Sequence, residues 1–330
     1  MTEAVNARHR GRAGIEWHRH RGSNTSRNLV LYGAIAANVG IAVAKFVAAA
    51  ITGSSSMLTE GVHSLVDSFN QVLLLYGQKR ATKRPDRAHP FGYGRELYFW
   101  AFVVAMLIFS VGASVSIYEG WQHVAHPEPL GSPLVNYIVL AIAFLLEGGS
   151  WLLAVRELAG HRREATWWQL VKRSKDPSSF IVLFEDSAAL IGLVLAAVGV
   201  WGSHVFGDPR IDGAASILIG LVLTLVAILL AREAKGLIIG EAADPALTRQ
   251  LREVLERRPE ITAVNHVRTL HTAPEIVFVA VSADFVDELS MGEGERLIEE
   301  MERELKAVSK NLGSIYIWPE RKEDAFGFDE

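Results

Sequence analysis

Six long apolar stretches, each sufficient to cross a lipid bilayer as a helix, dominate the first 231 residues of the chain. A bilayer core of about 30 Å needs roughly 20 helical residues. The stretches cover residues 29–51, 55–78, 97–118, 134–155, 179–201 and 213–231. Most charged residues are segregated away from them, and only one or two occur in each of the first, second, fourth and fifth stretches. This pattern predicts an all-α transmembrane domain of six helices over residues 29–235.

Basic residues predict the orientation of these helices. Six Lys or Arg residues precede the first stretch, six follow the second and six lie between the fourth and fifth, whereas the other three connections contain only Arg210. Because basic residues concentrate in cytoplasmic loops, both termini are expected in the cytoplasm, provided that residues 55–78 span the bilayer. The basic tail at 1–28 shows neither a signal peptide nor an organellar targeting segment. We therefore expect a bacterial inner membrane.

The composition excludes several kinds of partner and site. A formal net charge of −4 supplies no positive field for nucleic acid. The chain contains no cysteine, which excludes disulfides, thiolate nucleophiles and cysteine-based metal sites. Any metal must therefore be held by His, Asp, Glu or Asn side chains.

A second domain is predicted over residues 240–320, followed by a tail at 321–330. An amphipathic segment after Pro245 favours a helix, and two segments rich in β-branched residues alternate as strands do. A second amphipathic helix follows the cap Ser290, and a short strand ends the domain. The order α-β-β-α-β predicts a small α+β, ferredoxin-like domain with its helices on one face of a sheet.

The second apolar stretch carries the residues best suited to metal binding. His63 and Asp67 lie four residues apart and share one face of a helix, which Asn70 extends. Ionisable residues at membrane depth are costly and usually mark a site or pathway. An imidazole and a carboxylate so placed can bind one cation. The alternative is a buried His–Asp hydrogen bond that only fixes helix packing.

Further carboxylates could complete this site. Glu185 and Asp186 in the fifth stretch would bring the shell to the four ligands that zinc prefers. Adjacent residues point about 100° apart on a helix. The alternative is therefore that only one carboxylate, with Asp186 as our first choice, binds metal while the other pairs with a Lys or Arg on the cytoplasmic side. Glu147 in the fourth stretch and Lys45 in the first belong either to a proton path or to a structural ion pair.

Three sequence motifs, together with the α-β-β-α-β domain, resemble one protein family. They are H-S-L-V-D at 63–67, D-R-A-H-P-F-G-Y-G-R-E at 86–96 and Y-E-G-W-Q-H at the end of the third stretch. They are similar to motifs of the cation diffusion facilitator family of metal exporters, over almost the whole chain. The runs H-S-x-x-D-x-x-N-Q and F-E-D-S-A-A-L resemble the subgroup that contains the mitochondrial zinc transporter nine of animals.

The resemblance implies a homodimer that exchanges cytoplasmic Zn²⁺ for protons by alternating access, with no enzymatic activity and no organic cofactor. It also implies an intramembrane site to which the second and fifth helices each give two ligands four residues apart. His63 and Asp67 match the first pair, whereas apolar residues stand at the matching positions of the fifth helix. A shell of one nitrogen and several oxygens shifts the preference toward Mn²⁺ or Fe²⁺.

Peripheral family sites are matched only in part. Asp86 and His89 match a loop site in which Tyr93 replaces a second His. His266 matches a metal position of the soluble domain, but the closing His-x-Asp motif is replaced near the C-terminus. An odd separation also places His266 and His271 on opposite faces of one strand. We therefore expect the soluble domain to dimerise with little or no metal of its own.

Arg95, before the third stretch, and Glu241, after the sixth, resemble a family charge interlock at the junction of the two domains. The alternative is that Arg95 follows the positive-inside bias and Glu241 is solvated. A membrane-embedded zinc hydrolase is a competing function, but the chain lacks an H-E-x-x-H motif. A metal sensor is another, and the missing ligands of the soluble domain count against it.

Overall fold

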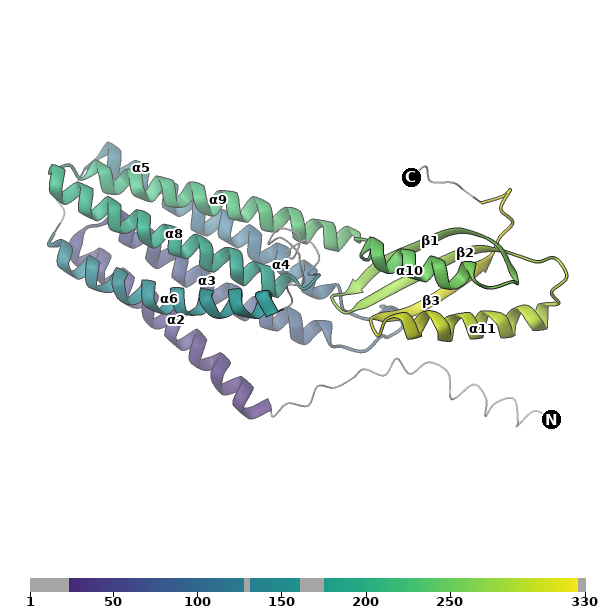
Figure 1. Cartoon of the computed structure of the whole chain (residues 1–330). Helices are drawn as coiled ribbons and strands as arrows, with labels where there is room; N and C mark the ends of the chain where they lie inside the picture. The colour runs from purple at the N-terminus through teal and green to yellow at the C-terminus, as the bar shows by residue number, and fades with distance from the viewer. Residues whose placement is uncertain (1–23, 128–130, 161–174, 326–330) are drawn as a thin grey trace. The chain divides into compact units, whose positions relative to one another are not determined.

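The computed structural model describes residues 24–127, 131–160 and 175–325, so most of the predicted N-terminal tail and the last five residues lie outside it. The described part contains six long helical stretches and a small mixed domain (Figure 1). The long helices are α2 (Asn24–Thr52), α3 (Ser55–Ala81), α4 (Glu96–Leu107) continuing through the π-helical η2 (Ile108–Ala113) into α5 (Ser114–Ala125), α6 (Pro133–Gly160), α8 (Pro177–Phe206) and α9 (Arg210–Ile239).

Four stretches in the described residues are long and apolar enough to cross a membrane. They are Glu96–Ala125, Pro133–Arg156, Phe180–Phe206 and Arg210–Ile239. Of α2, the run Asn38–Thr52 lies within the described residues, and this part is apolar. The polar residues of α3 exclude that helix from the four. The prediction of membrane-spanning helices is therefore confirmed for four, while the spans of α2 and α3 stay predictions.

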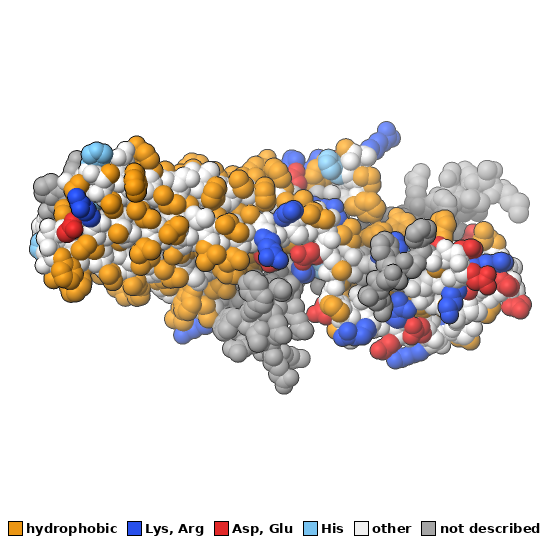
Figure 2. Space-filling view, turned by 90° about the horizontal axis from the view of Figure 1, so that it is seen from above, with side chains coloured by type: hydrophobic (Ala, Val, Ile, Leu, Met, Phe, Trp, Pro, Cys, Tyr) orange, Lys and Arg blue, Asp and Glu red, His pale blue; other side chains and the backbone are white. Residues whose placement is uncertain are grey.

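Large hydrophobic side chains are exposed on these helices. On α6, for example, Leu145 is 75% exposed and Leu153 is 66% exposed. Figure 2 shows hydrophobic side chains covering the helices, whereas acidic and basic side chains are dense over the small domain. An apolar surface of this extent is unfavourable in water and suits contact with lipid or with another protein.

The small domain has the predicted order α-β-β-α-β. It consists of α10 (Pro245–Glu256), β1 (Ile261–Ala273), β2 (Ile276–Phe285), α11 (Met291–Val308) and β3 (Leu312–Pro319). The strands form one sheet in the order β1-β2-β3, with β1 antiparallel and β3 parallel to β2. Asp244 caps α10, and Ser290 forms a capping box with Glu293 at the start of α11.

The core of this domain follows from the alternation of β2. Val277, Val279 and Val281 are buried on one face of the sheet and belong to the same apolar cluster as Leu251 of α10 and Leu305 of α11. Side chains two residues apart point to the same face of a strand. Both helices therefore pack on one face, as the sequence predicts.

The start of α3 is held by a buried carboxylate of α9. Asp212 is 0% exposed and accepts hydrogen bonds from the hydroxyls of Ser54, Ser55 and Ser56 and from the backbone N–H of Ser56. Its own N–H donates to Ser203 of α8 at 2.9 Å. A carboxylate at a helix N-terminus satisfies free N–H groups and interacts favourably with the helix dipole. Asp212 thus fixes where α3 begins relative to α8 and α9.

Asp212→Ala should destabilise the helical domain, because it leaves several buried donors without an acceptor. Hydrogen bonds to charged groups contribute about 1.5–3 kcal/mol each, so we expect a drop of several degrees in the melting temperature of the detergent-solubilised protein. Asp208→Ala is the matched control, because Asp208 lies in the same turn, is exposed and accepts one hydrogen bond from the Arg210 N–H. Equal melting temperatures of the two variants would contradict this role.

Candidate metal site

One face of α3 carries a row of polar side chains into the protein interior. Glu60, His63, Ser64, Asp67 and Asn70 recur at spacings of three and four, the period of one helical face. Glu60 and Asn70 are 0% exposed, and His63 is 2% exposed. The helix packs against α4, α5, α8 and α9, so this face is enclosed by protein.

His63 is buried without a hydrogen-bond partner on either ring nitrogen, and Asp67 has one such oxygen, Oδ1. His63 Nε2 lies 3.7 Å from Asp67 Oδ2, too far for a hydrogen bond. Buried polar groups are normally paired, because leaving one unpaired costs free energy. The alternative that this pair fixes helix packing needs a hydrogen bond that the structure does not contain.

The carboxylates of α8 lie beside this row and have different partners. Asn70 Nδ2 of α3 donates to Glu185 Oε1 at 2.7 Å, and Ser150 Oγ of α6 donates to Asp186 Oδ2 at 3.0 Å. Both carboxylates interact electrostatically with Asp67. The roughly 100° between adjacent helical residues directs one toward α3 and the other toward α6. The four predicted ligands thus come from two neighbouring helices.

These groups do not yet form a closed coordination shell. Within the described residues, no three His, Asp or Glu side chains are arranged so that they could hold a metal ion. Two ligands of one tetrahedral zinc ion, each about 2.0–2.2 Å from it, lie roughly 3.4 Å from one another. The 3.7 Å between His63 Nε2 and Asp67 Oδ2 is close to this spacing. Recruiting a carboxylate of α8 as a further ligand would require side chains to move.

Lys45 forms ion pairs with Glu147 and with Glu60, and Glu60 is a residue that the sequence analysis did not single out. The ammonium of Lys45 donates to Glu60 Oε2, Glu147 Oε1 and Ser64 Oγ, each at 2.9 Å. Glu60 could have been found from its position three residues before His63, because an ionisable residue on a polar face at membrane depth is a candidate by itself. Lys45 thus takes part in ion pairs, and a role of Lys45 or Glu147 in a proton path stays a prediction.

Comparison with known proteins decides the family. The model of the cation efflux transmembrane domain matches residues 31–239. This chain belongs to the cation diffusion facilitator family. The mouse and human proteins named "Proton-coupled zinc antiporter SLC30A9, mitochondrial" are 34% identical to it over 226 residues, which is 68% of this chain and 40% of each relative. The "Cation-efflux pump FieF" of Serratia proteamaculans is 25% identical over 79% of this chain and 82% of its own length.

The predicted family resemblance is thereby confirmed, and the protein is a multi-pass membrane protein. The relatives are named as antiporters and efflux pumps, in agreement with the prediction that the chain is not an enzyme. The chain spans two fifths of the length of the SLC30A9 proteins.

The family's loop site is filled by hydrogen bonds in this member. Asp86 Oδ2 accepts from the hydroxyl of Tyr93 at 2.7 Å and from Lys83 at 3.1 Å, while Oδ1 accepts the N–H groups of Ala88 and His89. Chiefly the Tyr93 hydrogen bond, and then the backbone bond from His89, lower the pKa of Asp86. Asp86 therefore organises the loop, and His89 Nδ1 remains 3.7 Å away.

In the soluble domain, a chain of hydrogen bonds lies next to the predicted position His266 in the sheet. Asn265 Nδ2 donates to the hydroxyl of Ser282 at 3.0 Å, and Ser282 donates to the carboxylate of Glu320. Burial, followed by the charge of Arg268, lowers the pKa of the neighbouring His266. His266 pairs with Ser282 across the sheet and His271 with Val277, which confirms that the two histidines lie on opposite faces.

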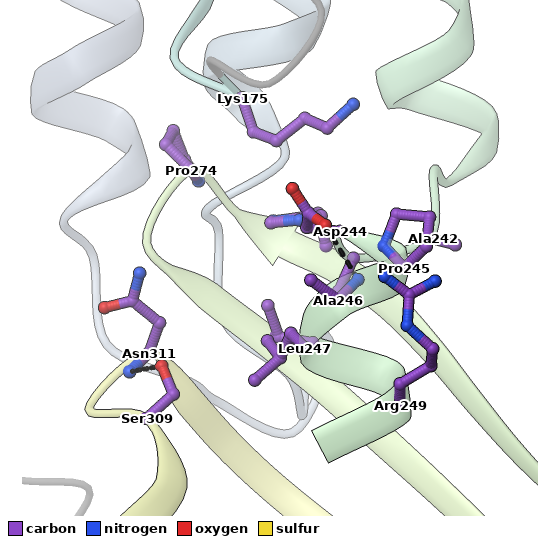
Figure 3. Close-up of a pocket in the computed structure, with 13 residues that line it drawn as sticks. Lys175, Ala242, Asp244, Pro245, Ala246, Leu247, Arg249, Pro274, Ser309 and Asn311 are labelled. Carbon is purple, nitrogen blue, oxygen red and sulfur yellow. Dashed lines mark hydrogen bonds between the residues drawn. The ribbon is translucent and has the colours of Figure 1, made fainter. Parts of the chain in front are cut away.

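At the predicted interlock, Glu241 is bonded to Lys175, which precedes α8. The guanidinium of Arg95 lies beside Gly240, the residue before Glu241. A pocket of about 520 Å³ opens next to this ion pair, and Figure 3 shows Lys175, Asp244 and Arg249 around it. The two predicted residues thus lie close together, although the observed partner of Glu241 is Lys175. A mechanical role of Arg95 and Glu241 stays a prediction.

Tyr93→Phe should loosen the loop, because it removes the hydrogen bond that contributes most to the lowered pKa of Asp86. A carboxylate with a lowered pKa stabilises the fold above its unfolded value, about 3.9, and loses this effect only as the pH falls through the lowered value. Hydrogen exchange of residues 83–93 should therefore show similar protection at neutral and mildly acidic pH, corrected for intrinsic rates, and less protection in Tyr93→Phe. Tyr118→Phe, at an exposed tyrosine, is the control. Extra protection of the loop by added Zn²⁺ would contradict a purely structural role.

Proposed function

We propose that this protein exports a divalent transition metal from the cytoplasm in exchange for protons, with Zn²⁺ as the first candidate. The observation that carries this proposal is His63, a buried imidazole whose two nitrogens lack partners and which faces the carboxylate of Asp67. The names of the relatives include zinc antiport and cation efflux. A site that must bind and release an ion benefits from ligands that no hydrogen bond already occupies.

The proposed ligands are His63 and Asp67 of α3 together with Asp186 or Glu185 of α8. Imidazole nitrogen and carboxylate oxygens are ligands of zinc, and the oxygen-rich set keeps Mn²⁺ and Fe²⁺ as alternative cargoes. Asn70 and Glu147 are proposed to position neighbours of the ligands. Asn70 donates a hydrogen bond to Glu185, and Glu147 accepts one from Lys45. Coordination would draw α3 and α8 closer, a movement suited to alternating access.

In the proposed membrane arrangement α2 and α3 also span the bilayer, both termini lie in the cytoplasm and the protein is a homodimer. The polar face of α3 is compatible with a span because neighbouring helices cover it. The face of the sheet away from α10 and α11 carries Tyr316 and Trp318, which are 60% and 69% exposed and suit contact with a second copy. A bacterial inner membrane remains our expectation, although the SLC30A9 relatives are named as mitochondrial.

Protons are the proposed counter-ions because metal and proton compete for the same ligands. A metal-binding imidazole must be deprotonated, and the reference pKa of histidine is about 6.5. His63 can therefore exchange a proton for a metal ion. An inward proton gradient would favour release of the metal on the outer side.

Asp67→Asn and His63→Ala should each strongly reduce uptake of radioactive zinc into inverted vesicles, because each removes a ligand. Even disturbing a partner of a metal ligand costs about 10–100-fold in affinity or activity, and we expect at least that loss. His89→Ala, at an exposed loop histidine, is the control for the histidine change.

Glu185→Gln and Asp186→Asn belong to the same series. The variant with the greater loss identifies the α8 carboxylate that binds the metal. Normal uptake by Asp67→Asn would overturn the proposed site.

Collapse of the proton gradient should slow zinc uptake into these vesicles. An acidic lumen drives exchange of internal protons for external zinc, so uptake should accelerate with the gradient and fall when a protonophore is added. Vesicles that contain the Asp67→Asn variant give the background. Uptake that is unchanged by the protonophore would rule out antiport while leaving a metal channel or uniporter possible.

A further inference from the structure

The ammonium of Lys45 occupies a complete oxygen cage inside the protein. Lys45 is 0% exposed, and its Nζ lies 2.9 Å from each of Glu60 Oε2, Glu147 Oε1 and Ser64 Oγ. A lysine ammonium has three N–H donors, so each donor has one acceptor. The cage is built by three helices, since Lys45 lies on α2, Glu60 and Ser64 on α3, and Glu147 on α6.

Both carboxylates of the cage keep an oxygen that the lysine does not use. Glu60 Oε1 and Glu147 Oε2 are buried and have no hydrogen-bond partner. Glu60 is itself 0% exposed, and its Oε1 lies against Gly192 of α8, where a Cβ would come within 2.3 Å. The missing side chain at Gly192 leaves room for this carboxylate. The cage therefore has more acceptor capacity than one ammonium consumes.

The oxygens around the Lys45 ammonium are arranged as the ligands of a bound cation would be. The two carboxylate oxygens bonded to Nζ lie at most twice 2.9 Å apart, on either side of one point. A divalent metal at that point needs oxygens at about 2.0–2.2 Å, so side-chain shifts of less than about 1 Å would convert the ammonium cage into a metal shell. Without Lys45 the cage would hold two buried negative charges, which are costly unless a cation compensates them.

We propose that Lys45 is a tethered cation that fills a second carboxylate site for divalent metals and thereby confines metal binding to His63 and Asp67. This inference rests on the proposed transport site. The second site would take a hard or borderline divalent cation such as Mn²⁺ or Zn²⁺, because its ligands are carboxylate and hydroxyl oxygens. Lys45 is thus a specificity-determining residue that sets the number of metal ions bound by each chain.

The test is made in the full-length protein in lipid nanodiscs, in a background that lacks the proposed transport site. His63→Ala with Asp67→Asn should bind neither Zn²⁺ nor Mn²⁺ tightly in equilibrium dialysis. Adding Lys45→Met should restore binding of one ion per chain. Adding Glu60→Gln and Glu147→Gln to that variant should abolish binding again, while Lys45→Arg in place of Lys45→Met should leave the site closed.

The outcomes separate this inference from the proposed function. If the background without Lys45→Met still binds one ion tightly, the proposed transport site is wrong. If the background variant binds no ion tightly and the addition of Lys45→Met adds no bound ion, the second site is wrong, whereas the proposed transport site is not contradicted.

Folding provides an independent readout, because Lys45→Met leaves two buried carboxylates. Yield and melting temperature that recover when Mn²⁺ is present during purification would support the site. A Lys45→Met variant that stays misfolded with Mn²⁺, while the form with Glu60→Gln and Glu147→Gln folds, would overturn it.

Discussion

The free-energy cost of burying charge in an apolar helical domain governs the arrangement around α3. Glu60, His63 and Asp67 all face inward, and each must be compensated by a partner or by an ion. Other parts of the domain follow from this requirement. Lys45 reaches α3 from α2, Glu147 approaches from α6, and Asp212 of α9 binds the first turn of α3. These contacts connect the long helices through polar groups that lipid could not solvate.

Compensation is uneven along α3, and this unevenness supports the proposed metal site. At its start Asp212 accepts hydrogen bonds from three serines, and one turn later every N–H of the Lys45 ammonium is used. Glu60 and Glu147 of that cage each keep one buried oxygen without a partner, whereas at His63 both ring nitrogens lack partners, as does Asp67 Oδ1. A saturated group stabilises one structure, whereas an unsaturated buried group is stabilised only when a ligand arrives. The segment around His63 is therefore suited to a transient cation.

Outside the helical domain, the loop before α4 and the sheet near His266 are held by hydrogen bonds between side chains. Asp86 holds the loop before α4 through Tyr93, and Ser282 connects Asn265 with Glu320 across the sheet. In each place a hydroxyl donates a hydrogen bond to a carboxylate, from Tyr93 to Asp86 and from Ser282 to Glu320. A carboxylate that already accepts several hydrogen bonds gives up more on binding a metal than a free one does. The expectation that these peripheral positions bind little or no metal stays a prediction, which the hydrogen bonds at Asp86 and Ser282 support.

The sequence alone determined four membrane-spanning stretches, the α-β-β-α-β order and the family, and it pointed to the neighbouring side chains His63 and Asp67, because apolar length and helical spacing are local properties. Only the tertiary structure revealed that Glu60 and Asp212 are buried ion partners and that Glu241 pairs with Lys175. Partners of a buried charge come from residues distant in the chain, and no local pattern specifies them. The same limit explains why Glu185 and Asp186, which are neighbours in sequence, could be told apart only by the different helices they face.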